Sequence, residues 1–314
     1  MRLAILLLLC LFTLPAAAQQ LQLDRTNAAN ATVGQLAFLG AVVVPPGPDR
    51  LGGLSAISLD KDGKTLTALS DSGRVFQGQL QWADGHLVGV SFDHGRRLLD
   101  EDGKPVRTRA RYDSEALTAL QGGGWLLGFE RDHRIERYAS WTTAPVPLAA
   151  PPGLGGLPRN EGLEALTQLE DGTILTIAEA AGPDGAHQAW LYKEGAWQGM
   201  TYQSAPGLKP VDLVVLPGGD VAVLERGFNL FHGFRTRIAR IALRDMAPGA
   251  ALAAATLAQL ENPLLTENFE GMTILNDSDR GVATLLIVSD NNFNAAQQTI
   301  LAAFELNSPH LTQP

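Results

Sequence analysis

The chain has 314 residues with 24 basic and 33 acidic side chains, which gives a formal net charge of −9. An acidic chain lacks the basic surface that nucleic-acid binding requires, so we expect no nucleic-acid partner. The single cysteine, Cys10, leaves no internal disulfide to be formed. The length fits one closed all-β domain.

The first 18 residues are predicted to be a secretory signal peptide. Arg2 supplies the positive charge, Leu3–Leu14 is an apolar run too short to span a bilayer, and Ala16–Ala18 offers small residues for cleavage. A retained membrane anchor is the alternative. Cleavage leaves residues 19–314 as a single domain without cysteine. We expect this domain to be a monomer that is periplasmic or secreted and makes no contact with a membrane.

A sequence motif that recurs five times along the chain predicts a β-propeller. In each copy a small or acidic residue opens an apolar run, a glycine-rich turn follows, and a second apolar run ends on an acid. The opening residues lie roughly 50 residues apart, which is the spacing of propeller blades with several short strands each. The copies run from Ser55 to Asp71, Glu115 to Glu130, Glu164 to Glu179, Asp212 to Glu225 and Glu270 to Asp290.

Short runs of Val, Ile, Leu and Thr, bounded by Gly, Pro and Asp, divide the copies into strands. In the first copy, strands are expected at Leu54–Leu59, Thr65–Ser70, Arg74–Trp82 and His86–Phe92. In the third copy they are expected at Leu163–Leu169, Thr173–Ala178, Gln188–Lys193 and Trp197–Tyr202, and in the fourth at Val211–Leu216, Val221–Leu224, Arg237–Leu243 and Leu252–Leu260.

The two ends of the repeat region suggest how the ring closes. The fifth copy ends after Thr299–Leu306 and lacks a fourth strand, whereas the N-terminal run Gly34–Val44 has no partner of its own. We expect this run to pair with the last copy, because closure removes exposed strand edges. The sequence therefore predicts five blades. Six is the alternative, because Asp93–Arg111 and Glu136–Gly156 are long enough to hide degenerate strands.

Three segments outside this pattern have their own expectations. No long helix is expected; Asp245–Leu260 is alanine-rich, so partial helix is the alternative there to the strand at Leu252–Leu260, although a proline and a glycine interrupt the segment. Pro145–Pro158 is expected to be an ordered loop. In Arg107–Arg111 the arginines alternate, as in a strand with one basic face, which either holds an anionic substrate or is a solvated face.

Strand order predicts that the acids of the repeats meet at one mouth of the central channel. Successive strands of a blade alternate in direction, so the start of the inner strand and the end of the second strand lie on the same face. Carboxylates gathered there repel each other unless some are protonated or cations lie among them. Oxygen ligands from Asp, Glu and Asn suit Ca²⁺, with Mg²⁺ as the alternative, better than zinc. A purely structural ion-pair network and an acid pair that works without metal are the other interpretations.

Candidate site residues follow from this arrangement. The carboxylates would bind a metal ion or act as general bases. The arginines would hold the anionic end of a substrate and the negative charge that develops in the transition state. The candidate metal ligands are Glu115, Glu164, Asp212, Glu270, Asp290 and Asn291; the candidate general bases are Glu161 and Glu130; and the candidate substrate-binding arginines are Arg131, Arg159 and Arg226.

The same phrases resemble the phytase-like, esterase-like family of secreted bacterial proteins. The resemblance extends from about Leu51 to Leu306 and implies a propeller fold with hydrolytic activity on esters or phosphoesters. The chain lacks the Asp-rich opening motif and the lysine-rich phosphate site of calcium-dependent propeller phytases, so phytate specificity is not implied. The phrases that carry the resemblance are Asp113–Leu117, Arg159–Leu166, Leu224–Gly227, Asn268–Met272 and Val288–Phe293.

These observations predict a metal-assisted hydrolase for a small anionic ester or phosphoester. The alternative is a non-catalytic propeller, a binding or scaffold module whose acids lock the blades together. A quinone-dependent sugar dehydrogenase is a third interpretation, but the four tyrosines and five tryptophans form no visible cluster of cofactor contacts.

Overall fold

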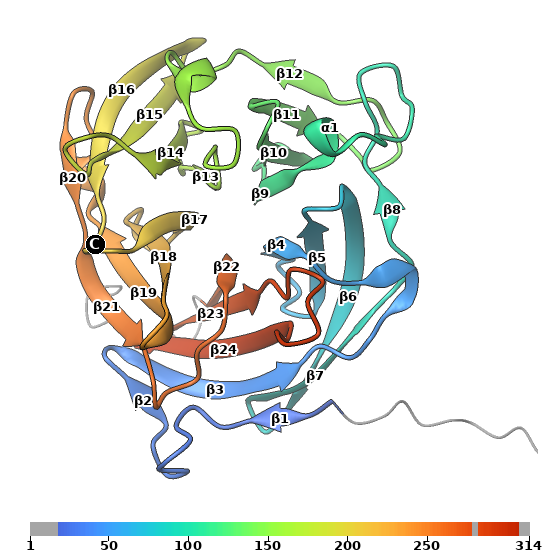
Figure 1. The fold of residues 1–314 in the computed structure, drawn as a ribbon, viewed down its shortest axis with the longest axis vertical. Coiled ribbons are helices and arrows are strands. Elements are labelled where there is room, and N and C mark those ends of the chain that lie inside the picture. Colours follow the sequence, from blue (N-terminus) through green and yellow to red (C-terminus); the bar gives the residue numbers. More distant parts are fainter. Residues whose placement is uncertain (1–17, 278–281, 308–314) are drawn as a thin grey trace, which may run out of the picture.

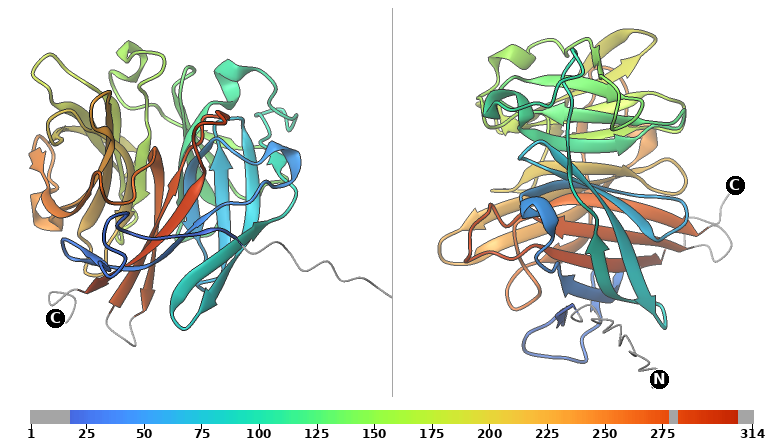
Figure 2. Two further views of the ribbon diagram at one scale, coloured as in Figure 1. Left: turned by 60° about the horizontal axis from the view of Figure 1, so that its bottom comes forward. Right: turned by 90° about the vertical axis from the view of Figure 1, so that its right-hand side faces the viewer.

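The computed structural model describes residues 18–277 and 282–307, which are almost entirely β-structure. Figure 1 shows five sheets arranged around a central axis, and Figure 2 shows their strands running between the two faces of the ring. The predicted five-bladed β-propeller is confirmed, since the described strands fall into five sheets. Residues 1–17 of the predicted signal peptide lie outside the described residues.

Blades one and two have the predicted antiparallel order from the axis outward. Blade one consists of β4 (Leu54–Leu59), β5 (Thr65–Ser70), β6 (Arg74–Ala83) and β7 (His86–Phe92), with the short β8 (Arg96–Arg97) added to β6. Blade two consists of β9 (Ser114–Ala119), β10 (Trp125–Phe129), β11 (Arg134–Tyr138) and β12 (Val146–Leu148).

Two expectations for the segments around these blades were wrong. The strand β12 and the 3₁₀ turn η2 (Leu154–Gly156) lie in the segment expected to be a loop. The alternating arginines do not form a strand, because the backbone N–H groups of Arg111 and Tyr112 both donate to the carbonyl of Thr108. These bonds close the short helix α1 (Arg109–Tyr112), which carries two of the arginines.

Blades three and four are linked by an exchanged strand. The alanine-rich segment after β19 is not helical. The 3₁₀ turn η3 (Leu243–Asp245) is followed by two strands. The segment is extended because it buries Leu252, Leu257 and Leu260 against the sheets. Its first part, β20 (Ala251–Ala253), pairs in parallel with β16 of blade three, and its second part, β21 (Ala255–Leu260), pairs with β19 of blade four. Blade three contains β13 (Ala165–Gln168), β14 (Ile174–Ala181), β15 (His187–Lys193) and β16 (Ala196–Gln203), and blade four contains β17 (Lys209–Val215), β18 (Val221–Asn229) and β19 (Gly233–Ile241).

Blade five joins the two ends of the chain, as predicted. The N-terminal strand β3 (Leu36–Val43) pairs antiparallel with β24, with Val42 opposite Leu301 and Leu36 opposite Leu306. Strands β1 (Gln20–Leu21) and β2 (Thr32–Val33) extend the outer edge of β3. The remaining strands of the blade are β22 (Phe269–Asp277), β23 (Val282–Ser289) and β24 (Ile300–Asn307).

The hydrophobic core is divided among the contacts between neighbouring blades. Phe269 and Phe304 of blade five pack in one cluster with Leu224 of blade four. Phe76 of blade one packs in another cluster with Leu286 of blade five. Three further clusters lie between blades three and four, one and two, and two and three. Because each blade buries apolar surface against two neighbours, the ring has to close for the core to be complete.

A buried ion pair fixes the contact between blades three and four. Arg237 on β19 places Nη1 3.0 Å from both carboxylate oxygens of Glu225, which is fully buried and also accepts a hydrogen bond from the Tyr202 hydroxyl. The other guanidinium nitrogens donate to Ala254 O at 2.6 Å and to Thr256 Oγ1 at 2.8 Å. Arg237 thus holds the segment where the chain leaves β20 and enters β21.

We predict that Arg237→Met lowers the free energy of unfolding by about 3–5 kcal/mol, because it leaves the buried Glu225 carboxylate without its cation. The matched control is Arg240→Met on the same strand. Its partner Asp220 lies 3.3 Å away at the surface, so about 1 kcal/mol or less is expected. Urea unfolding of both variants measures the difference, and equal losses would contradict the role of Arg237.

Candidate functional site

A β-bulge at the start of the inner strand points an opening residue out of the regular ladder. On β9, Ser114 pairs with Phe129 and Ala116 with Gly128, so Glu115 has no partner. The same one-residue shift leaves Glu270 unpaired on β22. Bulges re-aim the side chain of the extra residue. The bulged positions of blades one, two, four and five are Ser55, Glu115, Val211 and Glu270, and Glu164 of blade three directly precedes β13.

A repeated backbone hydrogen bond places the closing acids at the same height. The N–H of Glu130 donates to Asp113 O at 2.8 Å, two residues before the opener Glu115. Asp71, Glu179 and Asp290 each donate in the same way, at 2.9 Å, to the residue two before their own opener. The bulges and these bonds therefore build two rings of side chains at one mouth of the channel, as the strand order predicted.

Blade four breaks the pattern, and here the sequence alignment of the repeats was one residue out. The register pairs Lys209 with Arg226, so Val211 occupies the opening position and Arg226 the closing position. A shift of one residue moves a side chain to the other face of a strand. The expected pair Asp212 and Glu225 therefore does not face the other acids.

Asp212 serves the backbone of the neighbouring blade instead. The side chain is 1% exposed, and its oxygens accept the N–H of Leu213 at 2.7 Å and the N–H of Met272 at 2.6 Å. Met272 lies on β22, so Asp212 ties blade four to blade five. Burial raises the pKa of Asp212 well above its usual value, while the two N–H donors oppose the shift. Because both carboxylate oxygens of Asp212 already accept backbone hydrogen bonds, we leave Asp212 out of the candidate metal site.

Buried carboxylates from blades two and three approach one another closely at the mouth. Two overlapping trios offer oxygen atoms that all lie within 4.8 Å of one another. Glu130 belongs to both trios and, like Glu164 and Glu179, is buried. The trios are Asp113, Glu115 and Glu130, and Glu130, Glu164 and Glu179.

The electrostatics of the mouth disfavour ionised carboxylates. Burial, followed by the charges of Glu164 and Glu270, raises the pKa of Glu115 well above its usual value. Burial is also the main reason that the pKa of Glu130 rises to about 7 and that of Asp290 to about 8. The pKa of Asp71 rises to about 6, for the same reason. The charged neighbours that act on the pKa of Glu115 are acids, so a cation beside it would favour its ionised form.

Arg226 pairs with acids on two sides of this cluster. Its Nη2 lies 3.0 Å from Glu270 Oε1 and 3.8 Å from Glu179 Oε1. Burial alone would lower the pKa of Arg226, but Glu270, Glu164 and Glu179 outweigh it and raise the pKa. At the edge of the cluster, Lys209 Nζ lies 3.4 Å from Glu179.

The other predicted site residues occupy varied positions. Arg131 forms an ion pair with Asp113, whereas the side chain of Arg159 is exposed and its carbonyl accepts the N–H of Arg131 at 2.8 Å. Glu161 lies 3.2 Å from Lys209 Nζ. Asn291 accepts the N–H of Gly53 at 3.0 Å and that of Phe293 at 3.1 Å, so its amide oxygen shapes the adjoining loop.

Asp113 was missing from the predicted site. It is 3% exposed, it belongs to the first trio, and its carbonyl holds Glu130 in place. Its signal was its position two residues before an opener, the place that Gly53, Gly162 and Asn268 hold in other blades. The residue type at this position differs between blades, so the pattern of acids at the two ends of each repeat did not identify Asp113.

We predict that the stability of the metal-free protein falls as pH rises from about 5 to about 8. In this window the folded chain retains protons on Glu130 and Asp290 that the unfolded chain has released, so the free energy of unfolding decreases with pH. The change should be on the order of a few kcal/mol. Thermal unfolding in EDTA across this range measures it.

Added Ca²⁺ should flatten the same pH profile, because a bound cation favours the ionised carboxylates. The stabilisation by Ca²⁺ should therefore be larger at pH 8 than at pH 5. A profile in EDTA that is flat, or that rises with pH, would show that these acids are not held protonated by the fold.

Solved structures are similar to this chain at low sequence identity. The gluconolactonase XC5397 from Xanthomonas campestris is 13% identical, with 92% of this chain and 96% of that chain covered at a TM-score of 0.46. Virginiamycin B lyase from Staphylococcus aureus is 9% identical, with 92% and 99% covered at a TM-score of 0.43. At these identities and scores the likenesses say nothing about what this chain binds or converts.

The comparison with curated proteins gives no match. The model of one protein family, described as "Phytase-like: Esterase-like activity of phytase", matches residues 49–293. This stretch includes the strands of blades one to four and both rings of the channel mouth. The chain therefore belongs to this phytase-like family.

Proposed function

We propose that this protein is a metal-assisted hydrolase that acts on an ester or phosphoester at the carboxylate-lined mouth of the channel. The observation that carries the proposal is Glu115. Its carboxylate lies among Glu164, Glu270, Glu130 and Asp113, and their negative charges add to burial in disfavouring its ionised form. A divalent cation at this point would supply the missing positive charge.

The donor set fits a hard cation. The two trios are made of carboxylates, without histidine or cysteine, and such oxygen donors suit Ca²⁺, with Mg²⁺ as the alternative. We propose that Glu115 and Glu164, one from each trio, hold the cation. Glu270 adds a negative charge that acts on both, and Asp290 is close enough to Glu270 for their charges to interact. When bound there, the cation would supply Lewis-acid polarisation of a carbonyl or phosphoryl oxygen.

The remaining polar groups have roles of their own in this proposal. Glu130 belongs to both trios and has a pKa of about 7, which suits a group that accepts a proton near neutral pH. Glu161 is less suited, because Lys209 lies 3.2 Å from it. Arg226, held by Glu270, would bind negative charge on the substrate and in the transition state.

The compartment belongs to the proposal as well. The chain begins with the predicted signal peptide, and no helix in the described part of the chain is long and apolar enough to cross a bilayer. We propose that the mature chain is periplasmic or secreted and acts as a monomer.

A non-catalytic binding or scaffold module is the alternative, and one surface feature favours it. Leu230 and Phe231, at the tip of the hairpin between β18 and β19, are 88% and 90% exposed, with Phe228 at 59%. Apolar groups presented in this way often mark an interaction surface. This interpretation treats the acids of the mouth as links between blades.

Glu164→Gln separates the two proposals. We expect turnover to fall by about 100-fold or more, because a preorganised charged group is lost, while the thermal midpoint stays unchanged or rises. The assay is hydrolysis of p-nitrophenyl phosphate, bis-p-nitrophenyl phosphate and short acyl esters, each with Ca²⁺ and with EDTA. The control is Glu170→Gln, an exposed acid in the turn after β13, which should leave turnover as it is.

Three results would change this proposal. Retained turnover in Glu164→Gln would remove this residue from the site. Loss of stability without loss of specific activity would make Glu164 a link between blades. No turnover of the unaltered chain on any ester at any metal concentration would favour the binding module.

A further inference from the structure

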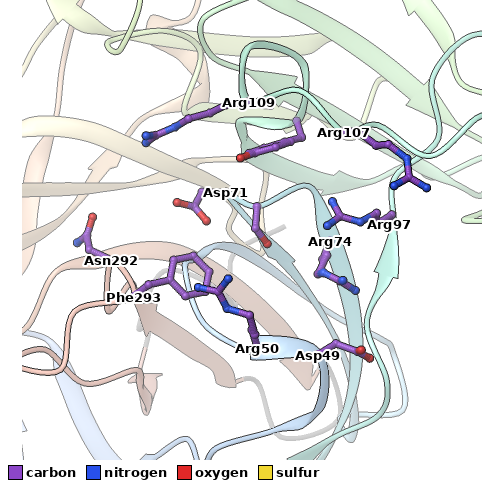
Figure 3. Close-up of a pocket in the computed structure, with 11 residues that line it drawn as sticks. Asp49, Arg50, Asp71, Arg74, Arg97, Arg107, Arg109, Asn292 and Phe293 are labelled. Atoms are coloured by element: carbon purple, nitrogen blue, oxygen red, sulfur yellow. The ribbon is translucent and has the colours of Figure 1, made fainter.

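A second polar feature lies beside the carboxylate cluster. Loops of blades one, two and five enclose a pocket of about 500 Å³, a volume within the range of small-molecule sites. Figure 3 shows Arg74, Arg97 and Arg107 at one end of this pocket, with Arg50 next to Phe293. Its charged lining consists of Arg50, Arg74, Arg97, Arg107 and Arg109, together with Asp49 and Asp71.

The arginines of this pocket come from separate elements. Arg50 ends the 3₁₀ turn η1 (Pro48–Arg50), Arg74 begins β6, Arg97 lies on β8, and Arg109 begins α1. Strand β8 is an addition to the four-stranded blade. A solvated face of one strand would not gather side chains in this way. The fold instead brings them to one hollow from segments that are far apart in the sequence.

The protein itself leaves most of this positive charge unbalanced. Among the described residues, no carboxylate oxygen lies within 4.0 Å of a guanidinium nitrogen of Arg50, Arg74, Arg97 or Arg107, and Arg109 reaches 4.0 Å from Asp113. Asp49 is engaged by His94 at 3.0 Å and by the N–H of Gly95 at 3.1 Å. The pocket therefore has five cations against two acids, in a chain whose net charge is −9.

One pair of arginines is placed where like charges are costly. Arg74 and Arg97 are directly opposite each other in the β6–β8 ladder, and like charges at such positions destabilise a sheet. Each donates a single hydrogen bond to a backbone carbonyl, Arg74 to Gly95 at 3.3 Å and Arg97 to Val106 at 3.5 Å. A guanidinium has five N–H donors, so both keep donors for a ligand.

We propose that this arginine pocket binds the phosphate group of a phosphorylated small molecule, and that it is the substrate-orienting subsite of the carboxylate mouth. A phosphate dianion offsets two positive charges, whereas a carboxylate offsets one, and arginine forks match phosphate oxygens in pairs. The volume leaves room for an organic part beyond the phosphate. Asp71 links the two sites, since it lines the pocket and its charge interacts with those of Asp113 and Glu270.

The orienting role rests on the proposed hydrolase, but phosphate binding does not. The binding test is therefore calorimetric titration of the metal-free protein in EDTA with inorganic phosphate, glycerol 2-phosphate and acetate. We expect saturable binding of both phosphates, tighter for the ester if the organic part is recognised, and about tenfold or more weaker binding of acetate. Equal affinity for acetate and the phosphates, or no phosphate binding, would overturn the proposal.

Variants on β8 provide a matched pair. Arg97→Gln, and Arg97→Gln combined with Arg107→Gln, should weaken phosphate binding by about tenfold or more. Arg96→Gln removes the same charge from the neighbouring residue, which does not line this pocket, and should change binding by less than about twofold. Equal weakening by Arg96→Gln and Arg97→Gln would reduce the effect to general surface charge and overturn the site.

The kinetic arm separates this inference from the proposed function. In a working hydrolase, Arg97→Gln should raise KM for p-nitrophenyl phosphate and leave KM for p-nitrophenyl acetate unchanged. Equal effects on both substrates would overturn the orienting role, with hydrolysis intact. Conversely, phosphate binding that persists in Glu164→Gln, without hydrolysis in any variant, would overturn the hydrolase and leave the phosphate site standing.

Discussion

The ring depends on the pairing of β3 with β24, because the apolar core lies between blades and not within them. A blade alone exposes both of its faces, and only when residues near position 40 meet residues near position 300 does the last blade gain its outer strand. Phe304, Leu301 and Ala303 of β24 are then buried against clusters shared with blades four and one. Closure also fixes the positions of the inner strands, so the geometry of the channel mouth follows from a contact on the rim.

The mouth of the channel brings many negatively charged side chains close together. The acids of blades two, three and five are brought together by bulges and by a repeated backbone hydrogen bond, which are backbone devices that hold whatever side chain the repeat carries. Blade four uses the same device to insert Arg226 in place of an acid. Arg226, together with Lys209 beside Glu179 and Arg131 beside Asp113, offsets part of the repulsion. The negative charge that remains favours the binding of an added cation.

Charge is also divided in space. The negative cluster lies where the inner strands begin, and the arginine pocket lies over blade one. Asp71 lines the pocket, and its charge interacts with those of Asp113 and Glu270. A molecule with an anionic group and a reactive bond would find complementary surroundings for each part. The side chain of Phe293, which lies under the Arg50 guanidinium at 5.5 Å, adds an apolar surface at the border.

The sequence by itself determined the repeat, the number of blades, the closing strand and the face on which the acids gather, because these depend on alternation of apolar runs and on strand direction. It also drew attention to Glu115, Glu130 and Glu164 through their place in the repeat. Tertiary structure alone decided the register of blade four, since shifting Asp212 by one residue conserves the apolar pattern and changes only which side chain faces the channel. It likewise decided the arginine pocket. The alternating run pointed only to Arg107 and Arg109, and Arg50, Arg74 and Arg97 join them only after the loops of blades one, two and five have packed together.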